Sequence, residues 1–330
     1  MEFRRFRTQR INASVRESVR ENWLSSDDFI LPLFCIDGQN RSEPIESMPG
    51  VTRVSPDCLI DMLGPLVEKG LSSVLLFGVP EHKGIEQAWA PDGIVQKSIP
   101  LVKKHYPFLE VITDVCFCSY THDGHCEIED NDTTIGYLAK VALSHAEAGA
   151  DVVAPSAMMD GQVWSIRRGL DLGGFSNTSI MSYAAKFASS YYGPFRDAAT
   201  CAPKTGDRKS YQMDPANGNE ALEEITEDIK QGAQSIIIKP ALSYLDIIAR
   251  ANDRFVIPII AYNVSGEFRM LSDAVKNGYA SEDVIFETLL SVKRAGADRI
   301  ISYFTPKVLE SLSSGQIRTR AEVIKEKVRI

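Results

Sequence analysis

Two lysines that follow short apolar runs have the residue type and position for covalent chemistry. Lys239 ends the run Ser-Ile-Ile-Ile-Lys at 235–239, directly before Pro240, and Lys186 stands just past the run at 179–183. Consecutive β-branched residues are typical of a short strand that is buried on both faces. Apolar surroundings favour the neutral form of an amine, and a neutral amine attacks a carbonyl carbon to form a Schiff base. The alternative for each lysine is an ordinary side chain that extends to solvent.

Three cysteines within eleven residues indicate a metal site. Cys116, Cys118 and Cys126 are clustered in this way, whereas the other three cysteines are scattered along the chain. In a reducing compartment such a cluster points to a metal ion more than to disulfides. Three thiolates suit zinc, and three protein ligands leave a fourth position for water or substrate, as in a catalytic site. A fourth ligand from His122 or His125 would instead make the site structural.

A long connection follows Lys186 and carries two arginines. Residues 187–219, which we call the lid, exceed the usual length of a loop, and segments of this length often cover active sites. Arg196, Arg208 and Gln212 lie within it. Guanidinium groups bind carboxylates through two hydrogen bonds, so the lid is a candidate carboxylate site.

The elements that must position these residues alternate along the chain. Apolar runs that predict strands occupy 29–34, 73–78, 110–115, 151–156, 179–183, 235–239, 258–263 and 299–303. Helical spacing occurs between them, at 56–69, 94–105, 133–148, 220–231, 244–251 and 282–295. Eight alternations of strand and helix predict an α/β protein with a parallel sheet closed as a (β/α)8 TIM barrel. No linker divides this barrel, which we expect to span residues 29–330.

The chemistry of such barrels lies at the carboxyl ends of the strands. Polar residues recur at these predicted ends, where Asp114, Ser156, Ser265 and Tyr303 join the two lysines. Each taken alone has an ordinary structural explanation. Together on one rim they predict a site, in which the Ser265 and Tyr303 hydroxyls could hold a second carboxylate.

Residues 1–28, which we call the arm, precede the barrel. The arm contains six arginines and little apolar periodicity, so it cannot form a core of its own. We therefore predict that it packs on a neighbouring subunit in a homo-oligomer.

The overall composition limits the classes of partner. The chain has 36 basic and 44 acidic residues and a formal charge of -8, which argues against a nucleic-acid surface. No apolar run has the length of a membrane span, and the N-terminus has no apolar segment of a secretory signal. These features predict a cytoplasmic protein that acts on small molecules.

Several long motifs resemble one enzyme family over nearly the whole chain. They are the segment from Asp114 to Cys126, Val-Val-Ala-Pro-Ser at 152–156, Met-Ser-Tyr-Ala-Ala-Lys at 181–186, Tyr-Gly-Pro-Phe-Arg-Asp-Ala at 192–198, Lys-Pro at 239–240 and Val-Ser-Gly-Glu-Phe at 264–268. They are similar to those of porphobilinogen synthase, also called 5-aminolevulinate dehydratase, in its zinc-cysteine form. This resemblance implies a lyase of haem and related tetrapyrrole biosynthesis that condenses two 5-aminolevulinate molecules.

The resemblance also implies a role for each site residue. Lys239 and Lys186 would form Schiff bases with the substrates that supply the propionyl side (P site) and the acetyl side (A site). The other implied roles are Arg196, Arg208 and Gln212 on the A-site carboxylate, Ser265 and Tyr303 on the P-site carboxylate, Asp114 and Ser156 on the P-site amino group, Cys116, Cys118 and Cys126 on zinc, and Glu224 on an allosteric magnesium ion. In this family the arm embraces an adjacent barrel in a homo-octamer.

Two rival functions remain from the residues alone. A class I aldolase on the same barrel would need only one Schiff-base lysine, which leaves Lys186 and the cysteines without a role. A zinc-dependent binding protein would need the cysteines but no turnover. Product formation from 5-aminolevulinate distinguishes both rivals from the synthase.

Overall fold

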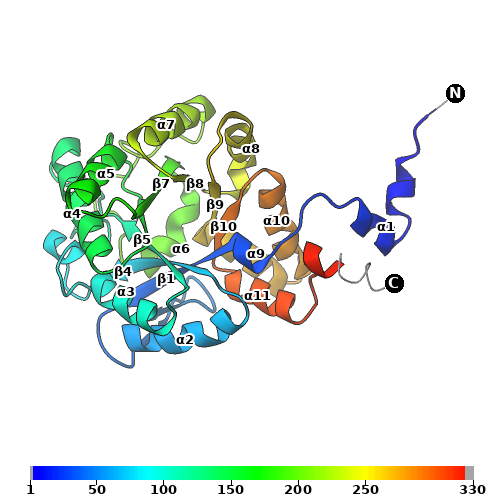
Figure 1. The fold of residues 1–330 in the computed structure, drawn as a ribbon, viewed down its shortest axis with the longest axis horizontal. Helices are drawn as coiled ribbons and strands as arrows, with labels where there is room; N and C mark the ends of the chain where they lie inside the picture. The colour runs from blue at the N-terminus through cyan, green and yellow to red at the C-terminus, as the bar shows by residue number, and fades with distance from the viewer. Residues whose placement is uncertain (1–2, 324–330) are drawn as a thin grey trace.

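A closed parallel barrel is the centre of the structure, a computed structural model that describes residues 3–323 (Figure 1). The barrel strands are β1 (Phe29–Ile36), β4 (Ser73–Val79), β5 (Glu110–Val115), β6 (Val152–Pro155), β7 (Ser179–Lys186), β8 (Ser235–Lys239), β9 (Ile259–Asn263) and β10 (Arg299–Ser302). Each strand pairs in parallel with the next, and β10 returns to pair with β1. The predicted (β/α)8 fold is therefore confirmed, and all eight expected strands are present, although β7 extends three residues beyond its predicted end.

The seam that closes the barrel joins its first and last strands. Phe29 pairs with Ile300 and Ile30 with Ile301, and the rest of β1 pairs with β4 from Leu31 onward. All residues of β1 are buried, because one face of the strand packs inside the barrel and the other against the surrounding helices.

Helices surround the strands on the outside of the barrel (Figure 1). They are α2 (Pro56–Glu68), α3 (Ile94–His105), α4 (Asn131–Glu147), α5 (Gln162–Leu172), α7 (Gly218–Gln231), α8 (Leu245–Arg254), α9 (Ser265–Lys276), α10 (Asp283–Arg294) and α11 (Thr305–Ser313). The helical segments expected from the sequence are all present, and α5, α9 and α11 are additional. Within residues 3–323, no helix is both long and apolar enough to cross a membrane.

A short antiparallel hairpin extends the sheet beside β1. It consists of β2 (Ser42–Pro44) and β3 (Thr52–Val54), and β3 pairs in parallel with β1. Three-residue strands are too short to show an apolar period, so the sequence does not predict this hairpin. The hairpin region supplies Arg53, whose guanidinium donates to the backbone oxygens of Asp197 and Ala198 in the lid.

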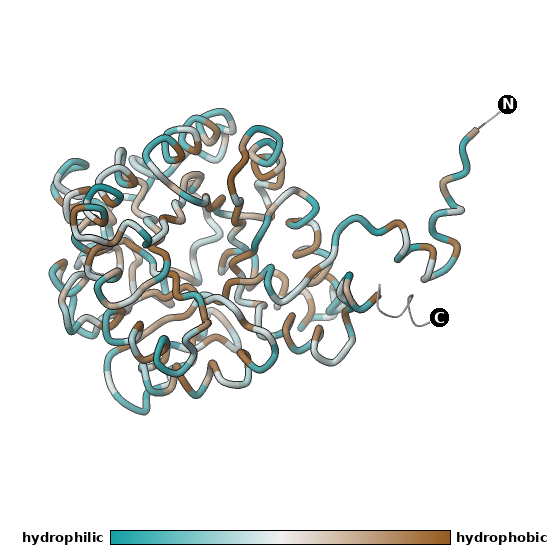
Figure 2. The backbone as a smooth tube through the Cα atoms, in the orientation of Figure 1, coloured by the Kyte–Doolittle hydropathy of each residue, from teal (hydrophilic) through white to brown (hydrophobic). Residues whose placement is uncertain are grey.

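The arm leaves the barrel and extends away from it (Figure 1). Its two short helices, η1 (Phe6–Arg10) and α1 (Ala13–Ser18), contain no buried residue. Figure 2 shows that apolar and polar segments alternate along the arm. Near its end Leu24 is buried against the barrel and Asp28 pairs with Lys293 at 2.9 Å. The projecting part of the arm therefore ends a few residues before the predicted boundary at residue 28.

Candidate active site

The two lysines stand side by side at the carboxyl ends of β7 and β8. Lys186 and Lys239 are direct pairing partners in the parallel ladder. A register shift between Ser182 and Ala185 carries β7 on to Lys186, so this lysine ends the strand rather than following it as predicted. Both side chains are buried, with 5% and 4% of their surface exposed, which excludes the solvent-exposed alternative.

One aromatic ring lies beneath both amines. The Tyr183 ring centroid is 5.7 Å from Lys186 Nζ and 5.1 Å from Lys239 Nζ. The rings of Tyr192, Phe195 and Tyr262 also surround Lys239 Nζ. Burial in this apolar environment, together with the positive charge of Lys186, lowers the pKa of Lys239 to about 7. A substantial fraction of Lys239 is therefore a neutral nucleophile near neutral pH.

Asp114 and Ser156 lie beside the lysines, as predicted. Lys186 Nζ donates a hydrogen bond to the Ser156 backbone oxygen. Burial and the Cys118 thiolate raise the pKa of Asp114 to about 7, although the two lysines oppose this shift. Asp114 Oδ1 is buried and has no hydrogen-bond partner among residues 3–323. This carboxyl group can therefore accept a hydrogen bond or exchange a proton near neutral pH.

The thiol cluster, which we define as Cys116, Cys118 and Cys126, forms directly after β5. The three buried sulfur atoms lie within 4.8 Å of one another. Neither histidine joins them, since His122 is exposed and the ring nitrogens of His125 contact Tyr211 Oη and Thr205 O.

The thiols of the cluster shift one another's pKa values: the neighbouring thiols and burial raise those of Cys116 and Cys126. Contacts with the other cluster thiols and with Cys201 hold the pKa of Cys118 well below its usual value. Three converging sulfur ligands fit a thiophilic divalent ion such as zinc.

The lid covers the lysines. Within it, η4 (Ser190–Tyr192) and α6 (Gly193–Ala198) place the Phe195 ring 4.9 Å from Lys239 Nζ. The Phe195 N–H donates to Ser265 Oγ at 2.9 Å, and this hydroxyl donates to Tyr191 O. The cavity between lid and lysines is about 10 Å³, roughly the space for one water molecule. Substrate can therefore reach the lysines only when the lid moves.

The predicted site residues divide into two groups by position. Asp114, Ser156, Lys186, Lys239 and Arg208 line the small cavity together with Cys118. Arg196, Gln212, Ser265 and Tyr303 are not among the residues that line it. Buried nitrogen and oxygen atoms of Arg196, Arg208 and Gln212 have no hydrogen-bond partner within the described chain. The Tyr303 hydroxyl lies 3.1 Å from that of Tyr262.

Comparisons with known proteins agree with this geometry. A sequence model of the family described as delta-aminolevulinic acid dehydratase matches residues 3–311. The chain belongs to this family. The dehydratase of Methanothermus sociabilis is 52% identical over 94% of this chain and 99% of its own length. That of Bacillus subtilis is 48% identical over 91% of this chain and 95% of its own length.

A solved member of the dehydratase family has the same fold. The enzyme from Toxoplasma gondii ME49, in complex with its reaction product porphobilinogen, superposes with a TM-score of 0.93 at 39% identity. The match covers 97% of this chain and 95% of that one. Because dehydratases of this family are metalloenzymes, the thiol cluster is the candidate metal centre of this chain.

Glu224 lies apart from the lysines, in what we call the acidic pocket. This cavity of about 590 Å³ is bordered by the carboxylates Glu127, Asp160, Asp214, Glu220, Glu224, Glu227 and Asp228. The helical spacing at 220–231 also predicts that Glu224 lies on an exposed helix, near its start. That expectation was wrong, because α7 begins at Gly218 and Glu224 is half-buried in its middle. Burial and the surrounding carboxylates raise the pKa of Glu224 to about 7.

One residue of this dehydratase site was missed from the sequence. Cys201, which is distant in sequence from the three clustered cysteines, is fully buried in the lid, and its thiol lies close enough to that of Cys118 to shift its pKa. Its position in the sequence could have indicated a place in the site. Cys201 lies midway between Arg196 and Arg208, in a segment that was expected to cover the site.

Proposed function

We propose that this chain has the activity of porphobilinogen synthase, condensing two molecules of 5-aminolevulinate to porphobilinogen with loss of water. The observation that carries this proposal is the direct pairing of Lys186 and Lys239, both buried over the Tyr183 ring beside the thiol cluster. A class I aldolase would use one such lysine. A pair of buried amines in contact with one cavity instead supports two carbonyl substrates held side by side.

The lysines do the covalent chemistry. Each neutral amine adds to the ketone of one substrate and expels its oxygen as water, giving a C=N bond. The imine at Lys186 acidifies the adjacent carbon, which then attacks the carbon held at Lys239. The second ring bond forms when the amino group of the P-site substrate attacks the A-site carbon and releases Lys186. The C–N bond to Lys239 breaks as the adjacent carbon loses a proton, which forms a ring C=C bond and frees the second amine. Loss of one further proton completes the pyrrole ring. Asp114, with its pKa near 7, is placed to exchange a proton with the P-site amino group.

The residues around the lysines orient the substrates. The unpaired donors of Arg196, Arg208 and Gln212 support the A-site carboxylate role, because a bound carboxylate supplies the acceptors that they lack. Ser265 and Tyr303 support the P-site carboxylate role less directly. Their hydroxyls contact the Phe195 N–H and the Tyr262 hydroxyl, so a P-site carboxylate must replace these contacts when the lid moves.

The thiol cluster holds a zinc ion in this proposal. Cys116, Cys118 and Cys126 are the ligands, and a zinc ion bound there supplies Lewis acidity to the condensation. The proposed activity is tested by measuring porphobilinogen formation from 5-aminolevulinate, with and without a chelator. A chain that binds zinc but forms no product would be a binding protein, contrary to this proposal.

Glu224 is proposed to hold a magnesium ion that stimulates the enzyme from the acidic pocket. Magnesium takes oxygen ligands and keeps several of its waters, which a wide, carboxylate-lined cavity accommodates. We expect Mg²⁺ to raise turnover of the wild type but not of Glu224→Ala. The stimulation should weaken below pH 7, because the Glu224 carboxyl then takes up a proton.

Glu223→Ala is the matched control for this prediction. Glu223 is an exposed carboxylate one position away that pairs with Arg254, and it does not border the acidic pocket. Its loss should leave the magnesium response intact. Equal stimulation of wild type and Glu224→Ala would place the ion elsewhere.

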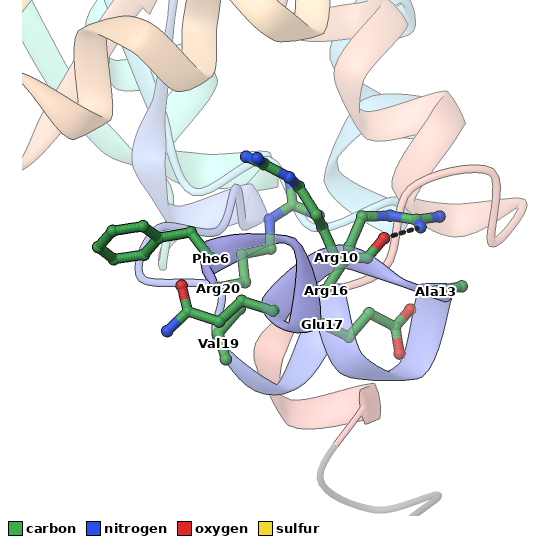
Figure 3. A pocket seen from close by; sticks show the side chains of 8 residues that line it. Phe6, Arg10, Ala13, Arg16, Glu17, Val19 and Arg20 are labelled. Atoms are coloured by element: carbon green, nitrogen blue, oxygen red, sulfur yellow. Dashed lines mark hydrogen bonds between the residues drawn. The ribbon is translucent and has the colours of Figure 1, made fainter. Parts of the chain in front are cut away.

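The arm is proposed to assemble the chain into a homo-octamer. Phe6 and Val19 are exposed beside Arg10, Arg16 and Arg20, around a groove of about 590 Å³ between the two short helices (Figure 3). Apolar side chains exposed on a projecting segment gain stability by burial against another subunit.

Deletion of residues 1–22 should therefore reduce both mass and activity. This deletion keeps Leu24 and the ion pair of Asp28 with Lys293, so the barrel itself stays intact. Sedimentation should show a particle much heavier than 36.5 kDa for the full chain and a smaller one after deletion. A monomeric full-length enzyme, or a truncated one of unchanged mass and activity, would contradict the assembly role.

A further inference from the structure

The lid contributes a fourth thiol next to the thiol cluster. Cys201 is 0% exposed, and its thiol and that of Cys118 lie close enough to shift each other's pKa. Its sulfur lies outside the group of three that fall within 4.8 Å of one another. It therefore lies beside the cluster, on the side of the lid.

The backbone on either side of Cys201 is fixed in this position. Thr200 adopts a left-handed conformation with φ of 49°, which is costly for a β-branched residue and is maintained here by its surroundings. Lys83 Nζ donates to Thr200 O at 2.7 Å. Arg208 Nη2 donates to both Cys201 O and Gly124 O at 2.6 Å. The guanidinium thus joins the lid to the loop that carries the cluster.

Close packing adds to this junction. A Cβ on Gly124 would lie 2.6 Å from Ala202 O and 2.9 Å from Cys201 O, so the two loops approach as closely as they do only because residue 124 is glycine. Lys204 N also donates to Asp123 O at 2.9 Å. The position of Cys201 beside Cys118 is consequently fixed by the packing of the closed lid against the cluster loop.

We propose that Cys201 is a fourth, displaceable ligand of the metal ion held by the thiol cluster, and that this bond fastens the lid when substrate is absent. The inference rests on the metal site of the proposed function. Three sulfur ligands leave one position of a tetrahedral ion open, and the buried thiol of Cys201 beside the cluster is a soft donor that can fill it. Substrate binding moves the lid, withdraws Cys201 and returns the open position to the reaction.

Cobalt replacement tests the coordination directly. Co²⁺ bound to thiolates gives a charge-transfer absorption that grows with the number of Co–S bonds. Without substrate, loss of one thiolate from four in Cys201→Ser should reduce this band by about a quarter. Adding 5-aminolevulinate should lower the wild-type band to the same level and leave the variant unchanged.

Control variants distinguish a ligand role of Cys201 from metal binding by the thiol cluster alone. Cys58→Ser removes a half-buried cysteine of α2 that is outside the thiol cluster, and it should retain the full band. Cys201→Ala should match Cys201→Ser, with unchanged thermal unfolding as the check on folding. Identical bands in wild type and both Cys201 variants would overturn the fourth-ligand role, whereas no thiolate band in the wild type would overturn the metal site.

Lid mobility gives a second readout. Lys204 and Lys209 are exposed trypsin sites within the lid. If the metal bond of Cys201 fastens the lid, metal removal from the wild type and the Cys201→Ser substitution should each accelerate cleavage at these sites several-fold. Cys58→Ser should not. Equal cleavage rates in metal-loaded wild type and Cys201→Ser would overturn the fastening role.

Discussion

Replacing Lys239 with methionine should abolish porphobilinogen formation, with turnover falling by about 10⁴-fold or more. Methionine keeps the length and apolar stem of the side chain among the surrounding rings but has no amine. The barrel should therefore remain folded while the Schiff base is lost. Borohydride reduction with 5-aminolevulinate should add a substrate-derived mass to Lys239 in the wild type. Residue 239 of the variant should remain unmodified.

The pH dependence of borohydride trapping reports the protonation of the Lys239 amine. The pKa of Lys239 is lowered to about 7 by burial and by Lys186, so the neutral fraction is large above pH 7 and falls about tenfold per pH unit well below it. Trapping at Lys239 should slow accordingly between pH 7 and pH 5. Lys97→Met, which removes an exposed lysine of α3, should match the wild type. Near-normal turnover in Lys239→Met would exclude the covalent role.

Removal of metal from the thiol cluster should lower turnover by about 10²-fold or more, and added zinc should restore it. The triple substitution Cys116→Ala, Cys118→Ala, Cys126→Ala should give the same loss without rescue. The physical reason is that both changes remove the Lewis acid that the three buried sulfurs, within 4.8 Å of one another, are proposed to hold. Turnover and bound metal should be measured on the same samples.

Cys58→Ala is the control for these substitutions. This cysteine lies on α2, outside the cluster, so its loss should change neither the metal content nor the rate. Full activity of the wild type after complete metal removal, or of the triple variant, would show that the cluster has no catalytic part.

The barrel could be predicted from sequence because its strands are buried on both faces. Runs such as 73–78 and 235–239 are short, apolar and separated by helical spacing, and these local patterns are sufficient for the fold. The helix α9 was missed because it begins at Ser265 directly after β9, within a motif interpreted as the polar rim. The end of β7 was misplaced because the register shift after Ser182 has no signature in the sequence.

The active site was predictable where a residue follows its strand closely. Lys239, Asp114 and Cys116 are placed by the strands alone, since parallel strands end on one rim. Residues of the lid depend on the path of a long loop through space. Cys201 meets Cys118 only because Arg208 and Gly124 bring the lid against another loop, and no spacing in the sequence encodes that meeting.

The seam between β1 and β10 has a consequence for how the protein is made. β1 emerges from the ribosome early, but its partners Ile300 and Ile301 are synthesised about 270 residues later. Until then the apolar edge at Phe29 and Ile30 has no strand beside it, and such edges attract other chains. The nascent chain must therefore keep its first strand from aggregating for most of translation, and barrel closure waits for the last strand to be released.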